Sequence, residues 1–423
     1  MARQYFGTDG VRGVVGEALT DDLVERLGRA FARWTSGDSV LLGRDTRASG
    51  PALEAALASG LAGGGSNVTL GGVLPTPAVA LLADESGAVV SASHNPAEYN
   101  GVKLFRAGLK LEDAEEEAIE ALLDAGGDEG ATGSIVEAPG LGERYVELVT
   151  DRFGGPLGGL RVVVDCANGA MVEVGPAVFE RLGAVVTVIG ADPDGTNINA
   201  GCGATDLGLL SRTVAGGEFD LGVAFDGDGD RLLAVDARGA VVDGDQILAV
   251  LALNLGVDLV AVTQMTNLGF HRLMRERGIR VLTTEVGDRY VLEALRAAGG
   301  VLGGEQSGHI IYLNGHLTGD GLAAALLLCR AVVERDRPLA ELASAFEPFP
   351  QVMENVPVRS KALPGAILEE AERINTELGG RGRVLVRPSG TEPVVRVLAE
   401  AETAPEAQQL CGRIVPLVQR ELG

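Results

Sequence analysis

The chain has 423 residues, of which 46% are hydrophobic and 22% are charged, and its formal net charge is -24. At roughly 150 residues per domain, this length predicts about three domains with room for a fourth. The acidic balance argues against a nucleic-acid-binding protein, which needs a basic surface to neutralise phosphates, and it means that an anionic substrate would need a local cluster of cations.

Three segments share one pattern, in which an apolar strand, a polar turn, an amphipathic helix and a second apolar strand follow one another. These segments are residues 39–72, 160–190 and 259–287. Continuous Val and Leu runs with helices between them are typical of parallel strands that helices cover on both faces. The pattern therefore predicts three related α/β domains with mixed sheets between helices.

The last part of the chain predicts a smaller α+β domain. A proline-rich stretch at residues 346–365 indicates a linker, and the residues after it contain two helices and two strands. We expect the four domains to surround a central cleft. Their expected boundaries are residues 1–150, 151–246, 247–352 and 353–423.

The first polar motif is GTDGVRG near the start of the chain. Glycines flank Thr8, Asp9 and Arg12. A surface turn would explain this composition. The functional interpretation is that the loop brings Arg12 near an anion.

The stretch SASHNPAEYNGVK follows a short apolar run at residues 88–90. Ser93 could cap a turn or act as a nucleophile, but no Gly-x-Ser-x-Gly elbow surrounds it and no obvious triad follows. A serine can also carry a phosphoryl group, whose charge of about -1.5 to -2 would need Mg²⁺ and cations nearby. Lys103 lies just past the loop, and a lysine held among cations could lose its proton and act as a base.

The sharpest signal is LGVAFDGDGDR, where an apolar strand ends in Asp226, Asp228 and Asp230 with glycines between them. Alternation places the three carboxylates on one side of an extended loop, and glycine permits a tight turn around a common centre. Carboxylates this close repel one another unless a cation binds, and hard oxygen ligands suit Mg²⁺. A calcium loop of EF-hand type is disfavoured, because Arg231 replaces its glycine and Ala237 its glutamate. A plain turn at a strand end is the other interpretation.

Two later loops carry groups that suit a phosphorylated sugar. In GGEQSGH, Glu305 can accept two sugar hydroxyl protons at once, and Ser307 lies at the alternate position. In RPSGTEP, Arg387 is followed by two hydroxyls and a glycine on a tight loop, which makes a phosphate site. Either loop alone would also fit an ordinary turn.

Together these motifs resemble the α-D-phosphohexomutase superfamily over essentially the whole chain. The serine loop SASHNP, the metal loop DGDGDR, the sugar loop GEQSGH and the phosphate loop RPSGTEP occur in that family's order, one in each expected domain. The glutamine in GEQSGH, VGDRYV at residues 286–291 and TNINAGCGATD at residues 196–206 make the chain look most like the bacterial phosphoglucosamine mutase subgroup. Ala204, where that subgroup more often has serine, is one small departure.

The resemblance implies a role for each loop. Ser93 would be the phosphorylated residue and would bind Mg²⁺ together with the three aspartates, and Lys103 would act in proton transfer. Arg12 and Arg231 would lie beside the reacting phosphoryl. His94 and His309 would also be catalytic residues, with His309 close to the groups that hold the sugar. The sugar would contact Glu305 and Ser307, and would be read by the loop with Asp288, Arg289 and Tyr290. The far phosphate would be held by Arg387, Ser389, Gly390, Thr391 and Arg396.

Members of such a family move a phosphate between O6 and O1 of a hexose through a 1,6-bisphosphate. We expect interconversion of glucosamine 6-phosphate and glucosamine 1-phosphate, which feeds UDP-N-acetylglucosamine and cell-wall precursor synthesis. Phosphomannomutase/phosphoglucomutase activity is the alternative. A phosphoserine hydrolase of the alkaline phosphatase kind would need a His-rich zinc centre, and the four histidines lack metal-ligand spacing. A non-catalytic calcium- or sugar-binding module is disfavoured by the failed EF-hand positions and by the separate phosphate loop.

The resemblance also implies the cofactors and partners. We expect one Mg²⁺ per chain, a hexose 1,6-bisphosphate as activating primer, a phosphosugar substrate and a homodimer, without nucleic acid or membrane partners. We expect no signal peptide, because the first residues lack an apolar segment, and no membrane span, because the apolar runs are too short or are interrupted by polar residues. The four cysteines are far apart and form no CxxC pair, which fits reduced thiols. The expected compartment is therefore the cytoplasm.

Overall fold

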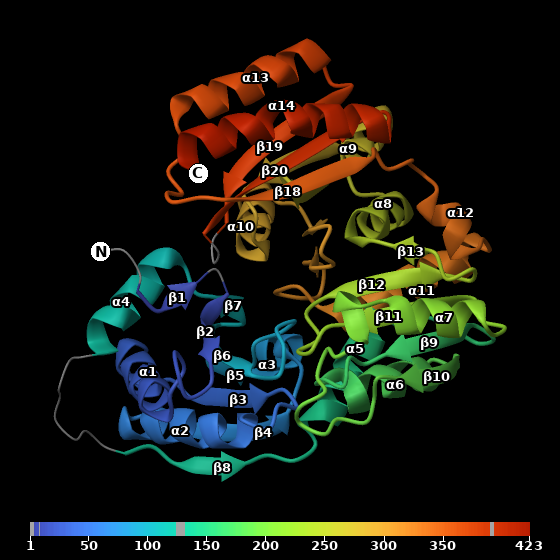
Figure 1. Ribbon diagram of the computed structural model, residues 1–423. Coiled ribbons are helices and arrows are strands. Elements are labelled where there is room, and N and C mark those ends of the chain that lie inside the picture. Colours follow the sequence, from blue (N-terminus) through green and yellow to red (C-terminus); the bar gives the residue numbers. More distant parts are fainter. Residues whose placement is uncertain (1–3, 8, 124–131, 390–392) are drawn as a thin grey trace. The chain divides into compact units, whose positions relative to one another are not determined.

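The computed structural model describes residues 4–7, 9–123, 132–389 and 393–423 (Figure 1). The chain forms two compact units. Unit 1 comprises Met1–Met265 and Ile279–Ala345, and unit 2 comprises Thr266–Gly278 and Phe346–Gly423. Mixed sheets between helices in unit 1 and a small antiparallel sheet in unit 2 confirm the predicted multi-domain α/β fold.

The first sheet of unit 1 has the strand order β1-β2-β6-β5-β3-β4-β8, and β7 pairs with β6. Its centre is parallel, because β3 pairs in parallel with both β4 and β5, whereas β6 runs antiparallel to β5. The strands are β1 (Phe6–Gly7), β2 (Gly10–Val14), β3 (Val40–Arg44), β4 (Val68–Val73), β5 (Ser86–Val90), β6 (Tyr99–Arg106), β7 (Leu109–Lys110) and β8 (Ile135–Glu137). The helices of this part of the chain are α1 (Asp21–Trp34), α2 (Gly50–Gly63), α3 (Thr76–Leu82), α4 (Asp113–Leu123) and α5 (Leu141–Phe153).

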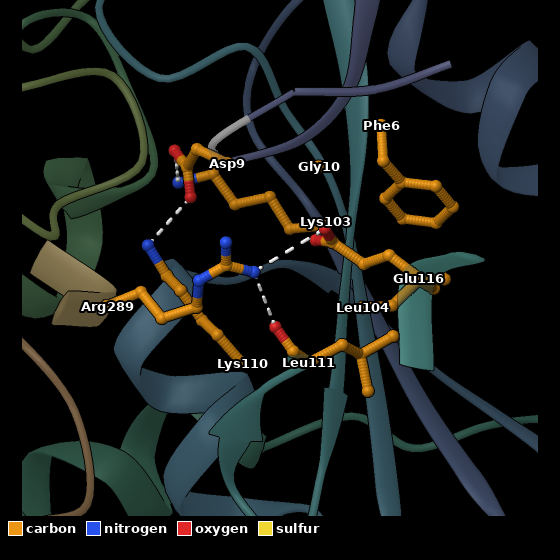
Figure 2. Close-up of a pocket in the computed structure, with 9 residues that line it drawn as sticks. All are labelled: Phe6, Asp9, Gly10, Lys103, Leu104, Lys110, Leu111, Glu116 and Arg289. Carbon is orange, nitrogen blue, oxygen red and sulfur yellow. Dashed lines mark hydrogen bonds and ion pairs between the residues drawn. The ribbon is translucent and has the colours of Figure 1, made fainter. Parts of the chain in front are cut away.

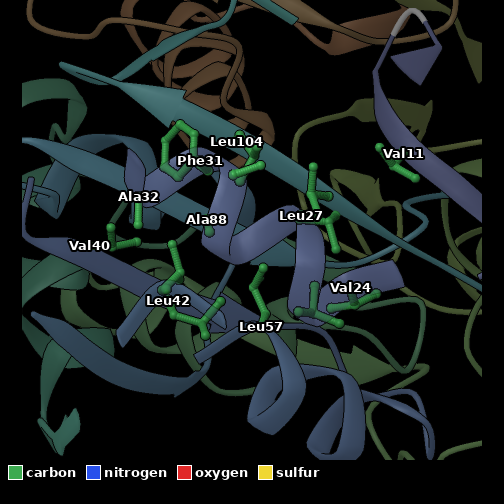
Figure 3. Close-up of a cluster of buried hydrophobic side chains, with 14 of the residues drawn as sticks. Val11, Val24, Leu27, Phe31, Ala32, Val40, Leu42, Leu57, Ala88 and Leu104 are labelled. Carbon is green, nitrogen blue, oxygen red and sulfur yellow. The ribbon is translucent and has the colours of Figure 1, made fainter. Parts of the chain in front are cut away.

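Helices cover both faces of this sheet, as the alternation of its side chains requires. Leu42 of β3 and Ala88 of β5 belong to a buried cluster with Leu27 of α1 and Leu57 of α2 (Figure 3). Gly43, the next residue of β3, faces the other way, and a Cβ there would lie 2.7 Å from the side chain of Val79 in α3. The strands are therefore buried on both faces, which explains why they read as continuous apolar runs.

The second sheet of unit 1 has the order β10-β9-β11-β12-β13, with β9 parallel to β10 and β11. A capping box formed by Asp243 and Gln246 starts the helix that follows it. The strands are β9 (Arg161–Asp165), β10 (Val185–Ile189), β11 (Leu221–Phe225), β12 (Leu232–Asp236) and β13 (Val241–Val242). The helices are α6 (Met171–Arg181), the 3₁₀ turn η1 (Gly203–Thr205), α7 (Gly208–Ala215) and α8 (Gly244–Leu255).

The third sheet of unit 1 has the order β15-β14-β16-β17, with β14 parallel to β15 and β16. Asp320 caps the long apolar helix after this sheet by accepting the N–H groups of Leu322 and Ala323. The strands are β14 (Leu259–Thr263), β15 (Arg280–Thr284), β16 (Leu302–Gly304) and β17 (Ile310–Tyr312). The helices are α10 (Asp288–Ala298), α11 (Gly321–Arg335) and α12 (Leu339–Ala343).

Unit 2 is built on an antiparallel sheet of order β18-β20-β19. Its buried cluster includes Val356, Val395 and Val397 of the sheet with Ile367 and Ile414 of its helices. Its elements are α9 (Leu268–Glu276), β18 (Gln351–Pro357), α13 (Gly365–Leu378), β19 (Gly382–Pro388), β20 (Val394–Ala401) and α14 (Ala404–Leu422).

The expectation that residues 346–365 form a linker is wrong for their central part, which is β18. Prolines in this stretch suggested an irregular segment, but β18 is the outer strand of its sheet and Pro357 lies at its end. Proline is tolerated there because an edge strand leaves some N–H groups without a ladder partner.

In the described part of the chain, no helix combines the length and the apolar character that crossing a membrane requires. All four cysteines, Cys166, Cys202, Cys329 and Cys411, are described, and each is a buried free thiol. Burial raises the pKa of the Cys329 thiol to about 12 and that of Cys411 to about 11. These thiols are therefore packing residues of low reactivity.

Candidate active site

Neighbouring parallel strands place the first site loops together. The last residue of β3, Arg44, is paired with the last residue of β5, Val90. The segment after β3 and the serine loop after β5 therefore leave the sheet at the same edge, where ligand sites of parallel sheets usually lie. The metal loop follows β11 in the second sheet in the same way, beside the end of its parallel neighbour β9.

The metal loop is held by backbone groups from three other segments of unit 1. The N–H groups of Thr76, Ala170 and Gly321 donate to the carbonyls of Asp228, Gly227 and Gly229, over 2.9, 2.8 and 3.1 Å respectively. Thr76 is the first residue of α3, which packs on the first sheet, and Gly321 is the first residue of α11, which follows the third sheet. Both helices therefore support the metal loop, which belongs to the second sheet. The loop conformation thus depends on the packing of unit 1 as a whole.

The carboxylates of Asp226, Asp228 and Asp230 fit a divalent cation. All three are buried, and each offers an oxygen within 4.8 Å of the others. Thr76 Oγ1 and Lys103 Nζ both bind Oδ2 of Asp228, whereas its Oδ1 is buried without a hydrogen-bond partner among the described residues. Burial, followed by the Asp230 and Asp228 charges, raises the pKa of Asp226 to about 7. A bound cation would give the unpaired Asp228 oxygen a partner and would stabilise the ionised form of Asp226.

The affinity of this cluster for a divalent cation is expected to fall as the pH drops below about 7. Asp226 binds a proton below its pKa of about 7, and a cation needs the ionised carboxylate, so proton and cation compete for it. The affinity should decrease by up to about tenfold for each unit of pH below this value and level off above it. Isothermal titration calorimetry of the metal-free protein with Mg²⁺ measures this, and an affinity equal on both sides of the pKa would contradict it.

Ser93 lies directly against the metal loop. Its hydroxyl donates to Oδ2 of Asp226 and lies 3.3 Å from Nδ1 of His94. Ser93 is fully buried and has a φ of 51°, a left-handed conformation that is uncommon for a serine. Gly227 permits the approach of the two loops, because a Cβ at this position would lie 2.6 Å from the Ser93 carbonyl oxygen.

Lys103 is surrounded by carboxylates rather than by cations. Its Nζ lies 2.7 Å from Asp228, 2.8 Å from Asp230 and 3.1 Å from Asp9. Burial alone would lower the pKa of Lys103, but these three anions raise it well above its usual value. The expectation that Lys103 sits among cations, with a depressed pKa, is therefore wrong for the described contacts of this residue. The charged ammonium instead fixes two carboxylates of the metal loop.

The two arginines expected beside the reacting group lie at the rim of this cluster. Arg12 pairs with Asp9 and donates to Asn95 Oδ1 in the serine loop over 3.4 Å. The Arg231 guanidinium approaches Asp226 with an Nε–Oδ2 distance of 3.9 Å. Burial, then the charges of Arg231 and Arg12, lowers the pKa of His94 to about 3. His94 is therefore neutral at physiological pH.

His309 connects the sugar loop to the metal loop. Its Nδ1 lies 3.0 Å from Glu305 Oε2, and its Nε2 lies 3.1 Å from Asp230 Oδ1. Burial lowers the pKa of His309, but Asp230 and other anions outweigh it and raise the pKa to about 10. The other oxygen of Glu305 accepts the Gly287 N–H, and Ser307 is exposed at the tip of the loop. The structure thus brings Glu305 and His309 to the aspartates.

Arg289, expected to read the sugar, is engaged elsewhere in unit 1. Its guanidinium donates to the Leu111 carbonyl over 2.9 Å and pairs with Glu116 of α4 (Figure 2). It also pairs with Asp113 of the same helix. The side chain is buried. Its neighbour Asp288 binds Lys110 over 2.7 Å. The sugar-reading role of this loop stays a prediction. Its described contacts join the start of α10 to β7 and α4.

The phosphate-loop residues belong to unit 2. Arg387 of β19 and Arg396 of β20 are directly paired in the antiparallel register, so both side chains lie on one face of the sheet. Ser389 is buried, and its N–H donates to the Val394 carbonyl over 2.9 Å. Gly390 and Thr391 lie outside the described residues.

The motifs gave no role to several residues that the structure places at the site. Asp9 lies between Arg12, Lys103 and Lys110, Thr76 binds Asp228, and Arg47 reaches into the serine loop. One signal was available for Arg47. The polar run Asp45-Thr46-Arg47 ends an apolar strand in the same way as the serine loop does, and such ends meet when the strands are parallel neighbours.

The chain is similar to known proteins over nearly its whole length. Family models described as phosphoglucomutase/phosphomannomutase domains I, II, III and C-terminal match residues 3–129, 143–239, 243–349 and 328–417. A phosphoglucosamine mutase of Saccharopolyspora erythraea is 49% identical over 98% of this chain and 99% of its own. One of Desulforudis audaxviator is 50% identical over 94% and 93%. The structure of a phosphoglucomutase/phosphomannomutase family protein of Burkholderia thailandensis matches with a TM-score of 0.81 and 25% identity over 98% of both chains.

Proposed function

Because this chain belongs to the phosphoglucomutase/phosphomannomutase family, we propose that it interconverts glucosamine 6-phosphate and glucosamine 1-phosphate through phosphorylated Ser93. The observation that carries the proposal is the contact of the Ser93 hydroxyl with Asp226, inside a buried cluster of three aspartates. The curated relatives at 47–50% identity, all named phosphoglucosamine mutase, support the amino sugar as substrate. The product would feed UDP-N-acetylglucosamine and cell-wall precursor synthesis.

The proposed reaction has two balanced transfers. In the first, the bond between phosphorus and Ser93 Oγ breaks, a bond to O1 of glucosamine 6-phosphate forms, and the O1 proton ends on Oγ. In the second, the 6-phosphate of the resulting 1,6-bisphosphate returns to Ser93 Oγ, and O6 regains a proton. Lys103 is the proposed relay for these protons. Its raised pKa keeps it protonated, so a proton is present near Oγ at the start of the first transfer.

Residues of the chain would neutralise and orient the transferring group. Asp226, Asp228 and Asp230 would hold one Mg²⁺ per chain, together with the phosphate on Ser93, and this ion would supply charge stabilisation for in-line transfer. Arg12 and Arg231 at the rim would add positive charge from the protein itself. This local cluster answers the difficulty that a net charge of -24 poses for an anionic substrate.

A second, non-reacting phosphate would bind at Arg387 and Arg396. The two arginines lie directly opposite one another on the same face of the sheet, so both guanidinium groups can bind one phosphate. Guanidinium groups recognise a phosphate rather than the sugar ring, so such a site can accept either end of a hexose bisphosphate. Ser389, Gly390 and Thr391 are proposed to complete it.

Replacing Arg387 by alanine is expected to raise KM for the hexose phosphate more than it lowers kcat. The lost guanidinium grips a phosphate that does not react, so it contributes to binding in the ground state and the transition state alike. A loss of about 2 to 3 kcal/mol of charge-assisted hydrogen bonding corresponds to a KM increase of roughly 30- to 150-fold. Steady-state kinetics measure this, with Arg381→Ala at the exposed end of the same hairpin as control. An unchanged KM would remove Arg387 from the phosphate site.

Mutase assays with glucosamine, mannose and glucose 6-phosphates, in parallel, test the proposal. Each assay contains Mg²⁺ and glucose 1,6-bisphosphate, the proposed activating primer. A clear preference for the amino sugar in kcat/KM is expected. A preference for mannose or glucose would favour phosphomannomutase/phosphoglucomutase activity, for which the similarity to the Burkholderia thailandensis structure is the specific support. No turnover on any substrate would overturn the proposal.

The remaining proposals concern the protein's surroundings. The buried free thiols support the cytoplasm as the compartment. A homodimer is proposed, and light scattering coupled to size-exclusion chromatography measures it. Phosphosugars are the proposed partners, without nucleic acid or membrane.

A further inference from the structure

We propose that Arg47 is a positioning residue that holds Ser93 in the conformation from which it exchanges the phosphoryl group. The inference rests on the proposed function, because it assigns Arg47 a part in the chemistry of Ser93. It concerns a residue outside the four motif loops, contributed by the segment that follows β3.

The side chain of Arg47 donates to the backbone of the serine loop at four places. Nη2 binds the carbonyls of Ser93 and Asn95 over 2.9 and 2.8 Å, and Nη1 binds those of Tyr99, over 2.8 Å, and Pro96. The side chain is fully buried. One guanidinium therefore serves as the internal scaffold of the whole loop from residue 93 to residue 99.

Asp45 completes this scaffold from the same segment. Its Oδ2 lies 2.8 Å from Arg47 Nε and accepts the Ser91 hydroxyl over 2.7 Å. The Ser91 hydroxyl in turn accepts the N–H of Ser93 over 2.9 Å. Both backbone groups of Ser93 are thus tied to the pair, the N–H through Ser91 and Asp45, and the carbonyl directly through Arg47.

The conformation of Ser93 explains why such ties are needed. Its φ of 51° is unfavourable for a residue with a Cβ, and strained backbone persists only where its surroundings over-determine it. In this conformation the hydroxyl of Ser93, in the loop after β5, reaches Asp226, in the loop after β11. Asn199 supplies a second donor to the Ser93 carbonyl over 2.9 Å.

Arginine is specific for this task. Its planar fork offers five N–H donors, whereas an ammonium offers three from a single point. Lysine at position 47 could keep the ion pair with Asp45. Its single ammonium could not bind both the carbonyls that Nη1 binds and those that Nη2 binds. The serine loop would then keep its fold and lose part of its order, and a displacement of about 1 Å at a reacting group costs about 100-fold in rate.

The test is the variant Arg47→Lys, with Arg44→Lys as matched control. Arg44 lies at the end of the same strand, pairs with Glu54 over 3.2 Å and donates to the Asp45 carbonyl over 3.3 Å. Its side chain has no described contact to the serine loop. Three properties are measured for wild type and variants. These are kcat and KM for glucosamine 6-phosphate, the single-turnover rate of phosphate transfer from glucose 1,6-bisphosphate to Ser93 by intact-protein mass, and amide hydrogen exchange of residues 91–99.

For Arg47→Lys we expect kcat and the single-turnover rate to fall about 100-fold, KM to stay within about twofold, and exchange to rise in residues 91–99 only. Arg44→Lys should match wild type. A merely structural role would lower stability without separating kcat from KM. Wild-type transfer rates and exchange in a folded Arg47→Lys protein would overturn the inference.

Two further measurements separate a failure of this inference from a folding defect and from a failure of the proposed function. If Arg47→Lys does not fold, Asn199→Ala removes the other donor to the Ser93 carbonyl, and a selective loss of kcat is again expected, whereas an unchanged kcat counts against the inference. If wild type takes up no phosphate on Ser93, the proposed function fails by itself. The exchange measurement then still reports whether Arg47 orders the serine loop, and unchanged exchange would overturn that role as well.

Discussion

Replacing Ser93 by alanine is expected to abolish mutase turnover while the protein still folds. The hydroxyl is the proposed carrier of the phosphoryl group, and removing a covalent carrier costs about a thousand-fold or more in kcat. Ser93 contributes little to the core, and alanine can keep its loop because the ties to Arg47, Ser91 and Asn199 are made by backbone atoms. Steady-state kinetics and thermal unfolding measure the two parts of this prediction.

Ser66→Ala is the matched control for this variant. Ser66 is also a fully buried serine of unit 1, and its hydroxyl has no hydrogen-bond partner among the described residues. The control should retain wild-type kcat. Intact-protein mass after incubation with glucose 1,6-bisphosphate adds a direct readout, since only the wild type and the control should gain a phosphate. A Ser93→Ala enzyme with wild-type turnover would falsify the assignment of the carrier.

Replacing Asp228 by asparagine is expected to have the second-largest effect. The variant keeps the size of the side chain but removes one of three charges, and the oxygen lost to the amide group is either the orphaned Oδ1 or the one bound by Lys103 and Thr76. We expect the Mg²⁺ concentration for half-maximal rate to rise by at least about 10- to 100-fold, and kcat at saturating Mg²⁺ to fall as well. A Mg²⁺ titration of the rate measures both.

Asp236→Asn is the matched control for the metal-loop variant. Asp236 is buried in the same sheet, but it pairs with Leu221 at the opposite end of β11 from the metal loop. It binds Arg238 and the backbone of a turn, so its loss should affect stability and leave the Mg²⁺ titration unchanged. If Asp228→Asn and Asp236→Asn gave the same titration curve, Asp228 would not be a metal ligand.

The sequence was most informative where a function is contained in a few consecutive residues. Asp226, Asp228 and Asp230 lie within five positions, and their spacing alone placed the carboxylates on one side of a loop, as the structure has them. The apolar runs of β3, β9 and β14 predicted parallel strands, and each of them pairs in parallel with two neighbours. These are local properties of the chain, and local properties survive folding unchanged.

Patterning was misleading where a partner comes from a distant segment. Lys103 was expected among cations, because the nearest motif was a phosphorylated serine loop. In the fold it meets Asp9, Asp228 and Asp230 from two other segments, so its pKa shifts in the opposite direction. Residues 351–357 read as a proline-rich linker, but pairing with β20 makes them a strand. A charge environment or a strand partner that comes from tens of residues to more than a hundred residues away leaves no trace in the local pattern.

By itself, therefore, the sequence determined the fold class, the family resemblance and the chemical groups of each loop. Tertiary structure alone decided how those groups act on one another. Arg47 meets the Ser93 carbonyl only because β3 and β5 are parallel neighbours, and Thr76 meets Asp228 only because the start of α3 lies against the metal loop. Hydrogen bonds and ion pairs have a range of a few ångströms, so their partners are set by the packing of sheets and not by spacing along the chain.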